Sequence, residues 1–435
     1  MKDAPPPAAP RALAMFPNAL ALISSKVSVM GLGFLFWLGA ARLFDASDVG
    51  LAAAVVAAMM LCTQVAVVGL GSAVIVHLPL EMRRPRALLD SAFTLVTVLA
   101  LMTGLGFLAL AALVFGELHV VADSPLYALL FVLTTVTGTL GILLDQLSTS
   151  LRRGDHALVR GIAFGIASLA SLACVVALGI GGSGALLVPW GVAGVVAVAI
   201  GLLQVRHSLA RYLPRPALIR SRALRLLATG APNYALTLAE RMPGLLLPVI
   251  VAELLSPATN AAWYMAWMMA WVVFIVPIQV GMTLFAEIAH EPASLPAATK
   301  RAVWTALLVG VPAAAALAAL AQPLLALLGE EYAGAGAIPL RILVVGLVPL
   351  IFVQAYYASC RGTGRLGEAI AAAWVAGLAS VGAAALAGSA AGLPAMAVAW
   401  VLVQVAAAAF AVVRLREIRN GYAARLSPHP AALVT

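Results

Sequence analysis

Four ionisable residues inside long apolar stretches are candidates for a transport site. They are Lys26, Asp145, Glu240 and Arg241. A charged side chain within a membrane-spanning segment is rare and usually marks a substrate or ion pathway. Lys26 and Arg241 would attract an anion, because apolar walls focus the field of a cation. Arginine offers a phosphate a planar fork of donors, whereas lysine acts as a point charge.

The two carboxylates suggest a different chemistry. Asp145 and Glu240 lie within apolar stretches, so either could bind a proton or sodium ion that couples transport to a gradient. Three structural alternatives stay open. Glu240 could form a static ion pair with Lys26 or Arg241, the two cations could snorkel to the inner interface, and Asp145 could stand at a helix end in that interface.

The composition sets the class of protein that must position these groups. Of 435 residues, 63% are hydrophobic and 10% are charged, against about 25% charged in soluble domains. The mean hydropathy is +1.06. These values exclude a soluble enzyme, a disordered chain and, despite the net charge of +9, a nucleic-acid-binding protein. Cys62, Cys174 and Cys360 lack metal-ligand spacing, so no metal or cofactor is predicted.

Twelve stretches are long and apolar enough to cross a bilayer as helices, which need about 20 residues each. The sequence therefore predicts an all-α polytopic membrane protein with 12 transmembrane helices. The predicted spans are 18–40, 49–72, 91–115, 125–147, 158–180, 185–205, 229–252, 261–286, 303–327, 337–359, 367–389 and 393–413.

A long basic loop divides six spans from six. We predict a disordered cytoplasmic tail over 1–17, an N-lobe over 18–205, a basic linker over 206–228, a C-lobe over 229–413 and a cytoplasmic tail over 414–435. Numbering the loops alternately places 22 of the 26 lysines and arginines on one side of the membrane. Basic residues favour the cytoplasmic side, so both termini are predicted to be cytoplasmic.

The two halves resemble each other at polar positions. At an offset of 215 residues, Lys26 falls on Arg241 and Gln64 on Gln279. Pro-Asn pairs that include Asn18 and Asn233 open the first and seventh spans at the same offset. SLRRGD (150–155) is similar to SCRGTG (359–364), and both follow the fourth span of their half. Parallel repeats of this kind place a transporter's site between its halves.

The chain resembles the multidrug/oligosaccharidyl-lipid/polysaccharide exporter superfamily, and within it the Wzx-like polysaccharide (O-antigen) flippases. The resemblance is carried by NALALISSKVSVMGLGFLFWLGAARLFDASDVGLAAA (18–54), by SLRRGD with SCRGTG, and by the six-plus-six layout. It implies two six-helix lobes around a central cleft. It also implies that an undecaprenyl-diphosphate-linked oligosaccharide is flipped from the inner to the outer leaflet by alternating access. Lipid II flippases of the superfamily usually have fourteen spans, which disfavours that branch.

The resemblance implies roles for several side chains. Lys26 and Arg241 would face each other across the cleft and bind the diphosphate of the carrier. Trp267 and Trp271, at helical spacing in one span, could stack on sugar rings, although packed or lipid-facing aromatics are more common. Four amides could bind glycan hydroxyls or tie helices together, which is their commoner use. These amides are Asn18, Asn233, Gln64 and Gln279.

Two other functions compete with the flippase. An ion-coupled multidrug or small-molecule exporter of the same superfamily would use the same architecture, with carboxylates and aromatics for organic cations. A membrane glycosyltransferase or polymerase would need a carboxylate base and a large outer loop; the predicted outer loops are short and no DxD-like motif occurs, so we predict no enzyme. The expected location is the bacterial inner membrane. Expected partners are membrane lipids, the lipid-linked substrate, and a polysaccharide polymerase or glycosyltransferases.

Overall fold

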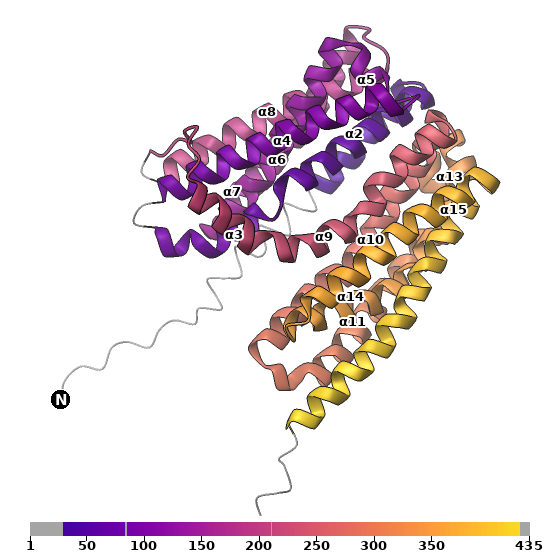
Figure 1. Cartoon of the computed structure of the whole chain (residues 1–435). Coiled ribbons are helices and arrows are strands. Elements are labelled where there is room, and N and C mark those ends of the chain that lie inside the picture. The colour runs from indigo at the N-terminus through magenta and orange to yellow at the C-terminus, as the bar shows by residue number, and fades with distance from the viewer. Residues whose placement is uncertain (1–28, 83–84, 210, 427–435) are drawn as a thin grey trace, which may run out of the picture. The chain divides into compact units, whose positions relative to one another are not determined.

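The structure, a computed structural model, is built from helices connected by short loops (Figure 1). It describes residues 29–82, 85–209 and 211–426. No strand occurs in these residues. Apolar side chains without helix-breaking patterns favour this outcome, since a helix satisfies its own backbone hydrogen bonds within the hydrocarbon core. The predicted all-α class is confirmed.

The helices follow one another closely along the chain. The first described helix is Val29–Leu43. It is followed by α2 (Ala46–Val67), α3 (Leu70–His77), η1 (Pro79–Glu81), α4 (Arg86–Val114), α5 (Val120–Asp123), α6 (Pro125–Ser150), α7 (Gly154–Ala177), α8 (Ser183–Ser208), α9 (Arg220–Leu254), α10 (Pro257–His290), η2 (Pro292–Ser294), α11 (Leu295–Ala319), α12 (Ala321–Ala326), α13 (Glu330–Val345), α14 (Leu347–Gly362) and α15 (Leu366–Leu426).

Each of the twelve predicted spans corresponds to a helix in the described part of the chain. Nine helical segments there are long and apolar enough to cross a membrane, and the bent pair α13 and α14 makes a tenth. The helix α15 contains the last two predicted spans, which meet at a break in the helical backbone at Ala391 and Gly392. The described part of the first span is Val29–Leu43. The chain is a multi-pass membrane protein.

The chain forms two compact units, Met1–Tyr234 (unit 1) and Ala235–Thr435 (unit 2). The division falls within α9, which begins at Arg220. This helix therefore starts inside the stretch 206–228 that the sequence suggested as a linker. The Pro-Asn pair that is predicted to open the seventh span lies inside α9, which begins at Arg220. The predicted tail 1–17 lies outside the described residues.

The core of unit 1 joins α3, α4, α6, α8 and the first turns of α9. Leu70, Phe93, Leu144 and Leu226 are among its buried side chains. Gly69 precedes α3 with a φ of 72°, a conformation that glycine adopts without strain. A Cβ on Gly69 would lie 2.3 Å from the carbonyl oxygen of Gly230 in α9. The absence of a side chain at Gly69 therefore lets the start of α9 pack directly on unit 1.

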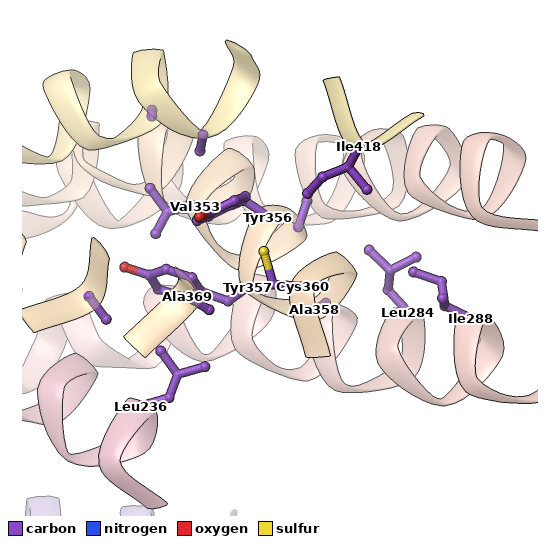
Figure 2. Close-up of a cluster of buried hydrophobic side chains, with 14 of the residues drawn as sticks. Leu236, Leu284, Ile288, Val353, Tyr356, Tyr357, Ala358, Cys360, Ala369 and Ile418 are labelled. Atoms are coloured by element: carbon purple, nitrogen blue, oxygen red, sulfur yellow. The ribbon is translucent and has the colours of Figure 1, made fainter. Parts of the chain in front are cut away.

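The core of unit 2 is built around the C-terminal half of α14 (Figure 2). Tyr356, Tyr357 and Cys360 of that helix are buried. Leu236 of α9 and Ile418 of α15 belong to the same hydrophobic cluster. Since α14 packs against α10, α11 and α15, polar groups on α14 are held by helices on several sides.

Candidate functional site

The predicted ion-coupling residue Glu240 belongs to a polar cluster within unit 2. Gln354 Nε2 donates a hydrogen bond to Glu240 Oε1 at 2.7 Å. Arg361 Nη2 lies 3.6 Å from Glu240 Oε2. The side chains of Glu240 and Arg361 are 20% and 15% exposed, respectively. Gln354 and Arg361 are seven residues apart on α14, about two helical turns, so both present to the same face.

The Arg361 guanidinium uses few of its donors. Its Nη1 has Met282 Sδ at 3.5 Å, a weak acceptor. Its Nε is buried and has no hydrogen-bond partner among the described residues. A guanidinium carries five N–H groups. The cluster therefore holds one neutralising carboxylate and several donors that could bind an added anion.

The predicted cation Arg241 is exposed. Successive residues of a helix are about 100° apart around its axis, so Arg241 and Glu240 point in different directions. The expectation of a static pair between Glu240 and Arg241 is wrong, because Glu240 pairs with Arg361. The other predicted cation, Lys26, lies outside the described residues.

The predicted residue Asp145 belongs to a second cluster, within unit 1. Arg160 Nη2 donates to Asp145 Oδ1 at 2.5 Å, and Arg160 Nη1 donates to Gln204 Oε1 at 2.6 Å. Ser148 Oγ accepts from both terminal nitrogens of Arg160 at 3.1 Å. The side chain of Arg160 is 4% exposed, whereas that of Asp145 is 58% exposed. This cluster ties α6, α7 and α8 together.

A third cluster ties the equivalent helices of unit 2. Tyr356 Oη of α14 donates to Glu368 Oε1 at 2.9 Å. Arg414 Nε, near the far end of α15, donates to the same oxygen at 2.7 Å. The fourth, fifth and sixth spans of each unit are therefore joined by a charged network near the same helix ends. The acid of this network is Asp145 on the fourth span in unit 1 and Glu368 on the fifth span in unit 2.

The predicted amides do not form one group. In unit 1, Gln64 accepts a hydrogen bond from Tyr234 Oη at 2.7 Å, which is the helix-tying use. In unit 2, Gln279 is exposed, and its backbone oxygen accepts a hydrogen bond from Thr283 Oγ1. Asn233 is exposed on α9. Asn18 lies outside the described residues.

The predicted aromatic residues of α10 differ in their surroundings. Trp267 is buried, and its ring centroid lies 5.2 Å from that of Trp400 and 5.8 Å from that of Trp263. Its indole also fills the space beside Gly244 of α9, where a Cβ would meet it at 2.7 Å. Trp271 is half-buried. The placement of Trp267 favours packing over contact with sugar rings.

Sequence reasoning missed several members of these clusters. Arg160 and Arg361 are among the 22 basic residues that the topology prediction assigns to the loops of one side, although Arg160 falls inside a predicted span. Gln354 and Glu368 also fall within predicted spans. The signal was present in the polar character of these positions, but only packing shows which residues meet. No group of three or more His, Cys, Asp or Glu that could hold a metal occurs in the residues that the structure describes.

Several solved structures of transporters have a similar fold. An inward-facing multidrug resistance MATE family transporter of the MOP superfamily is 17% identical, with 92% of this chain and 96% of that chain covered at a TM-score of 0.72. The lipid II flippase MurJ, in an inward closed conformation, is 12% identical, with 93% and 91% covered at 0.67. A MOP superfamily transporter from Pyrococcus furiosus is 16% identical, with 93% and 96% covered at 0.62. The chain has the MOP-superfamily fold.

The family itself is shown by sequence. Residues 40–336 match the model of a family described as polysaccharide biosynthesis protein. The chain belongs to this family, and the identification as a Wzx-like member of the multidrug/oligosaccharidyl-lipid/polysaccharide exporter superfamily is confirmed. A search of curated proteins gave no significant match.

Proposed function

We propose that the protein flips an undecaprenyl-diphosphate-linked oligosaccharide from the inner to the outer leaflet by alternating access. The family match with polysaccharide biosynthesis proteins supports a glycan-bearing substrate. The observation that carries the proposal is the exposed Arg241 on an apolar helix. Its neighbour Glu240 is held by Arg361 and Gln354.

The charge balance of unit 2 favours an anionic substrate. Arg361 compensates the one carboxylate near Arg241 on α9. Glu240 forms its ion pair with Arg361 rather than with Arg241, and in an apolar span the charge of Arg241 attracts a phosphate group strongly. Lys26 is proposed as a second cation, on the repeat that aligns it with Arg241.

The multidrug exporter alternative needs free carboxylates for organic cations. In the described residues, Asp145 is bound to Arg160 and Glu240 to Arg361. Both carboxylates are thus compensated by arginine, which makes them poor partners for a cationic drug. Glu240 remains the better candidate for ion coupling, because its pairing with Arg361 is longer than a hydrogen bond and can be broken at lower cost.

A deletion strain tests the substrate. We expect lipid extracts of this strain to accumulate the inner-leaflet lipid-linked oligosaccharide, and plasmid-borne wild type to restore export. Altered drug tolerance without glycolipid accumulation would select the multidrug exporter instead.

Complementation of the same strain tests the site. We expect Arg241→Gln to lower export by at least about tenfold, because it removes the charge that would contact the diphosphate of the carrier. Arg241→Lys should retain part of the activity, because it keeps the charge without the fork of donors. The matched control is Arg220→Gln, which removes an exposed charge at the start of the same helix. Equal export by Arg241→Gln and the control, at equal membrane levels, would exclude the proposed role.

We further propose that the protein resides in the bacterial inner membrane with both termini in the cytoplasm, on the distribution of basic residues. Polysaccharide polymerase or glycosyltransferases that make and use the substrate are the proposed partners. Reporter fusions at either end test the orientation. A reporter active outside the cytoplasm would contradict it.

A further inference from the structure

Unit 2 has a surface groove that the transport proposal does not use. It has a volume of about 280 Å³ and lies between the start of α11, the middle of α14 and the end of α15. Val303, Phe352 and Leu415 supply apolar walls. Trp304 also lines it and is 63% exposed. An exposed tryptophan near a helix end is typical of the interface between hydrocarbon and headgroups.

Three cations line the groove. Lys300 comes from α11, and Arg416 and Arg419 come from α15; all three are exposed. Two acids near them in sequence pair with other arginines, Glu287 with Arg301 and Glu417 with Arg414. The groove lining contains no acidic residue. Two distant segments thus bring positive charge to one apolar groove.

The groove also contains a buried threonine hydroxyl. Thr299 lines the groove, and its Oγ1 is buried with no hydrogen-bond partner among the described residues. Buried polar atoms are normally paired, so an unpaired one calls for a missing partner. An anionic headgroup would supply an acceptor for this hydroxyl beside the three cations.

We infer that this groove binds an anionic glycerophospholipid of the inner leaflet, with the phosphate among Lys300, Arg416 and Arg419 and an acyl chain along the apolar walls. The side of the membrane follows from the excess of basic residues at these helix ends. The occupant is a bulk phospholipid rather than the lipid-linked oligosaccharide, because exposed cations on long stems attract anionic lipid without strict geometry.

The inference is independent of the transported substrate. Its test uses the purified full-length protein in a neutral detergent, with phosphatidylglycerol, phosphatidylethanolamine, undecaprenyl diphosphate or inorganic phosphate added. Bound lipid is counted by native mass spectrometry, and the unfolding temperature is measured in parallel. We expect phosphatidylglycerol to bind at least about tenfold more tightly than phosphatidylethanolamine, and to raise the unfolding temperature most.

The variant Lys300→Gln/Arg416→Gln/Arg419→Gln should lose this preference. The matched control is Arg152→Gln/Arg206→Gln/Arg220→Gln, which removes three exposed charges from unit 1 and should keep it. Each cation removed in turn should weaken binding severalfold, so the three single variants give the same answer if the triple variant unfolds. Equal binding of both phospholipids or an equal loss in the control would overturn the inference. So would a triple variant that loses binding of undecaprenyl diphosphate or inorganic phosphate but keeps that of phosphatidylglycerol.

Discussion

Arg160, which is buried, and Arg361, which is half-buried, have similar neighbours but make different hydrogen bonds. In unit 1, the terminal nitrogens of Arg160 donate hydrogen bonds of 2.5 to 3.1 Å to an acid, an amide and a hydroxyl on two other helices. In unit 2, Arg361 has one carboxylate oxygen at 3.6 Å and a thioether at 3.5 Å. Both arginines lie near helix ends on the side of the membrane where the predicted topology places most of the basic residues.

The difference separates a structural role from a role in binding. The Nε of each arginine has no hydrogen-bond partner among the described residues, so the difference lies in the terminal nitrogens. A buried charge whose terminal nitrogens make several hydrogen bonds holds helices in place, because moving it would leave several groups unpaired. A charge whose terminal nitrogens have only longer contacts, as in Arg361, can change partners at lower cost. We therefore assign the Arg160 cluster to the scaffold of unit 1, and we propose Arg361 with Glu240 as part of the transport machinery.

The largest effect is expected from Arg160→Gln. Loss of the guanidinium leaves Ser148 and Gln204 without their partner and should lower the free energy of unfolding by about 2 to 3 kcal/mol. Thermal unfolding of purified protein measures it. The matched control is Arg153→Gln, which breaks an exposed pair with Asp155 and should cost less than about 1 kcal/mol. Equal losses in the two variants would remove the distinction between buried and surface arginine.

Arg361→Gln should show the reverse pattern. We expect export to fall by at least about tenfold, because the charge that balances Glu240 is lost. The unfolding temperature should fall by less than in Arg160→Gln, since fewer hydrogen bonds are broken. Arg361→Lys should restore part of the export. If Arg361→Gln instead unfolded the protein as severely as Arg160→Gln, the two clusters would share one structural role.

An exchange of positions sharpens the comparison. At the offset of 209 residues that aligns SLRRGD with SCRGTG, Asp145 falls on Gln354. The double variant Glu240→Gln/Gln354→Glu moves the acid beside Arg361 from α9 to α14. The acid would then stand on the fourth span of its unit, as Asp145 does in unit 1. We expect little change in unfolding temperature, because the acid stays near Arg361, and a severalfold loss of export. Unchanged export would show that the acid need not stand on α9.

The smallest effect is expected from Tyr356→Phe. It removes one hydrogen bond to Glu368, which keeps its bond to Arg414. Losing a single neutral donor costs about 1 kcal/mol, measured as a small decrease in unfolding temperature with export unchanged. A loss as large as that of Arg160→Gln would mean that the third cluster depends on this hydroxyl more than on its ion pair.

Much of the fold could be predicted from local sequence. Apolar length sets the number of spans, and polar breaks such as the one near Gly392 set their limits, because the bilayer requires about 20 apolar residues per helix. The start of α9 could not be predicted from its own residues. The stretch from Arg220 is basic and precedes a Pro-Asn pair, yet it is helical, since Gly69 and Gly230 allow it to pack against α3.

The sequence by itself determined that the protein spans a membrane, how its helices are ordered and which apolar segments carry charge. These properties depend on residue type and length, which are local. Only the tertiary structure decided that Arg160 meets Asp145 and that Arg361, rather than Arg241, meets Glu240. Ion pairs depend on atoms within a few ångströms, and that proximity is set by the packing of helices distant in the chain.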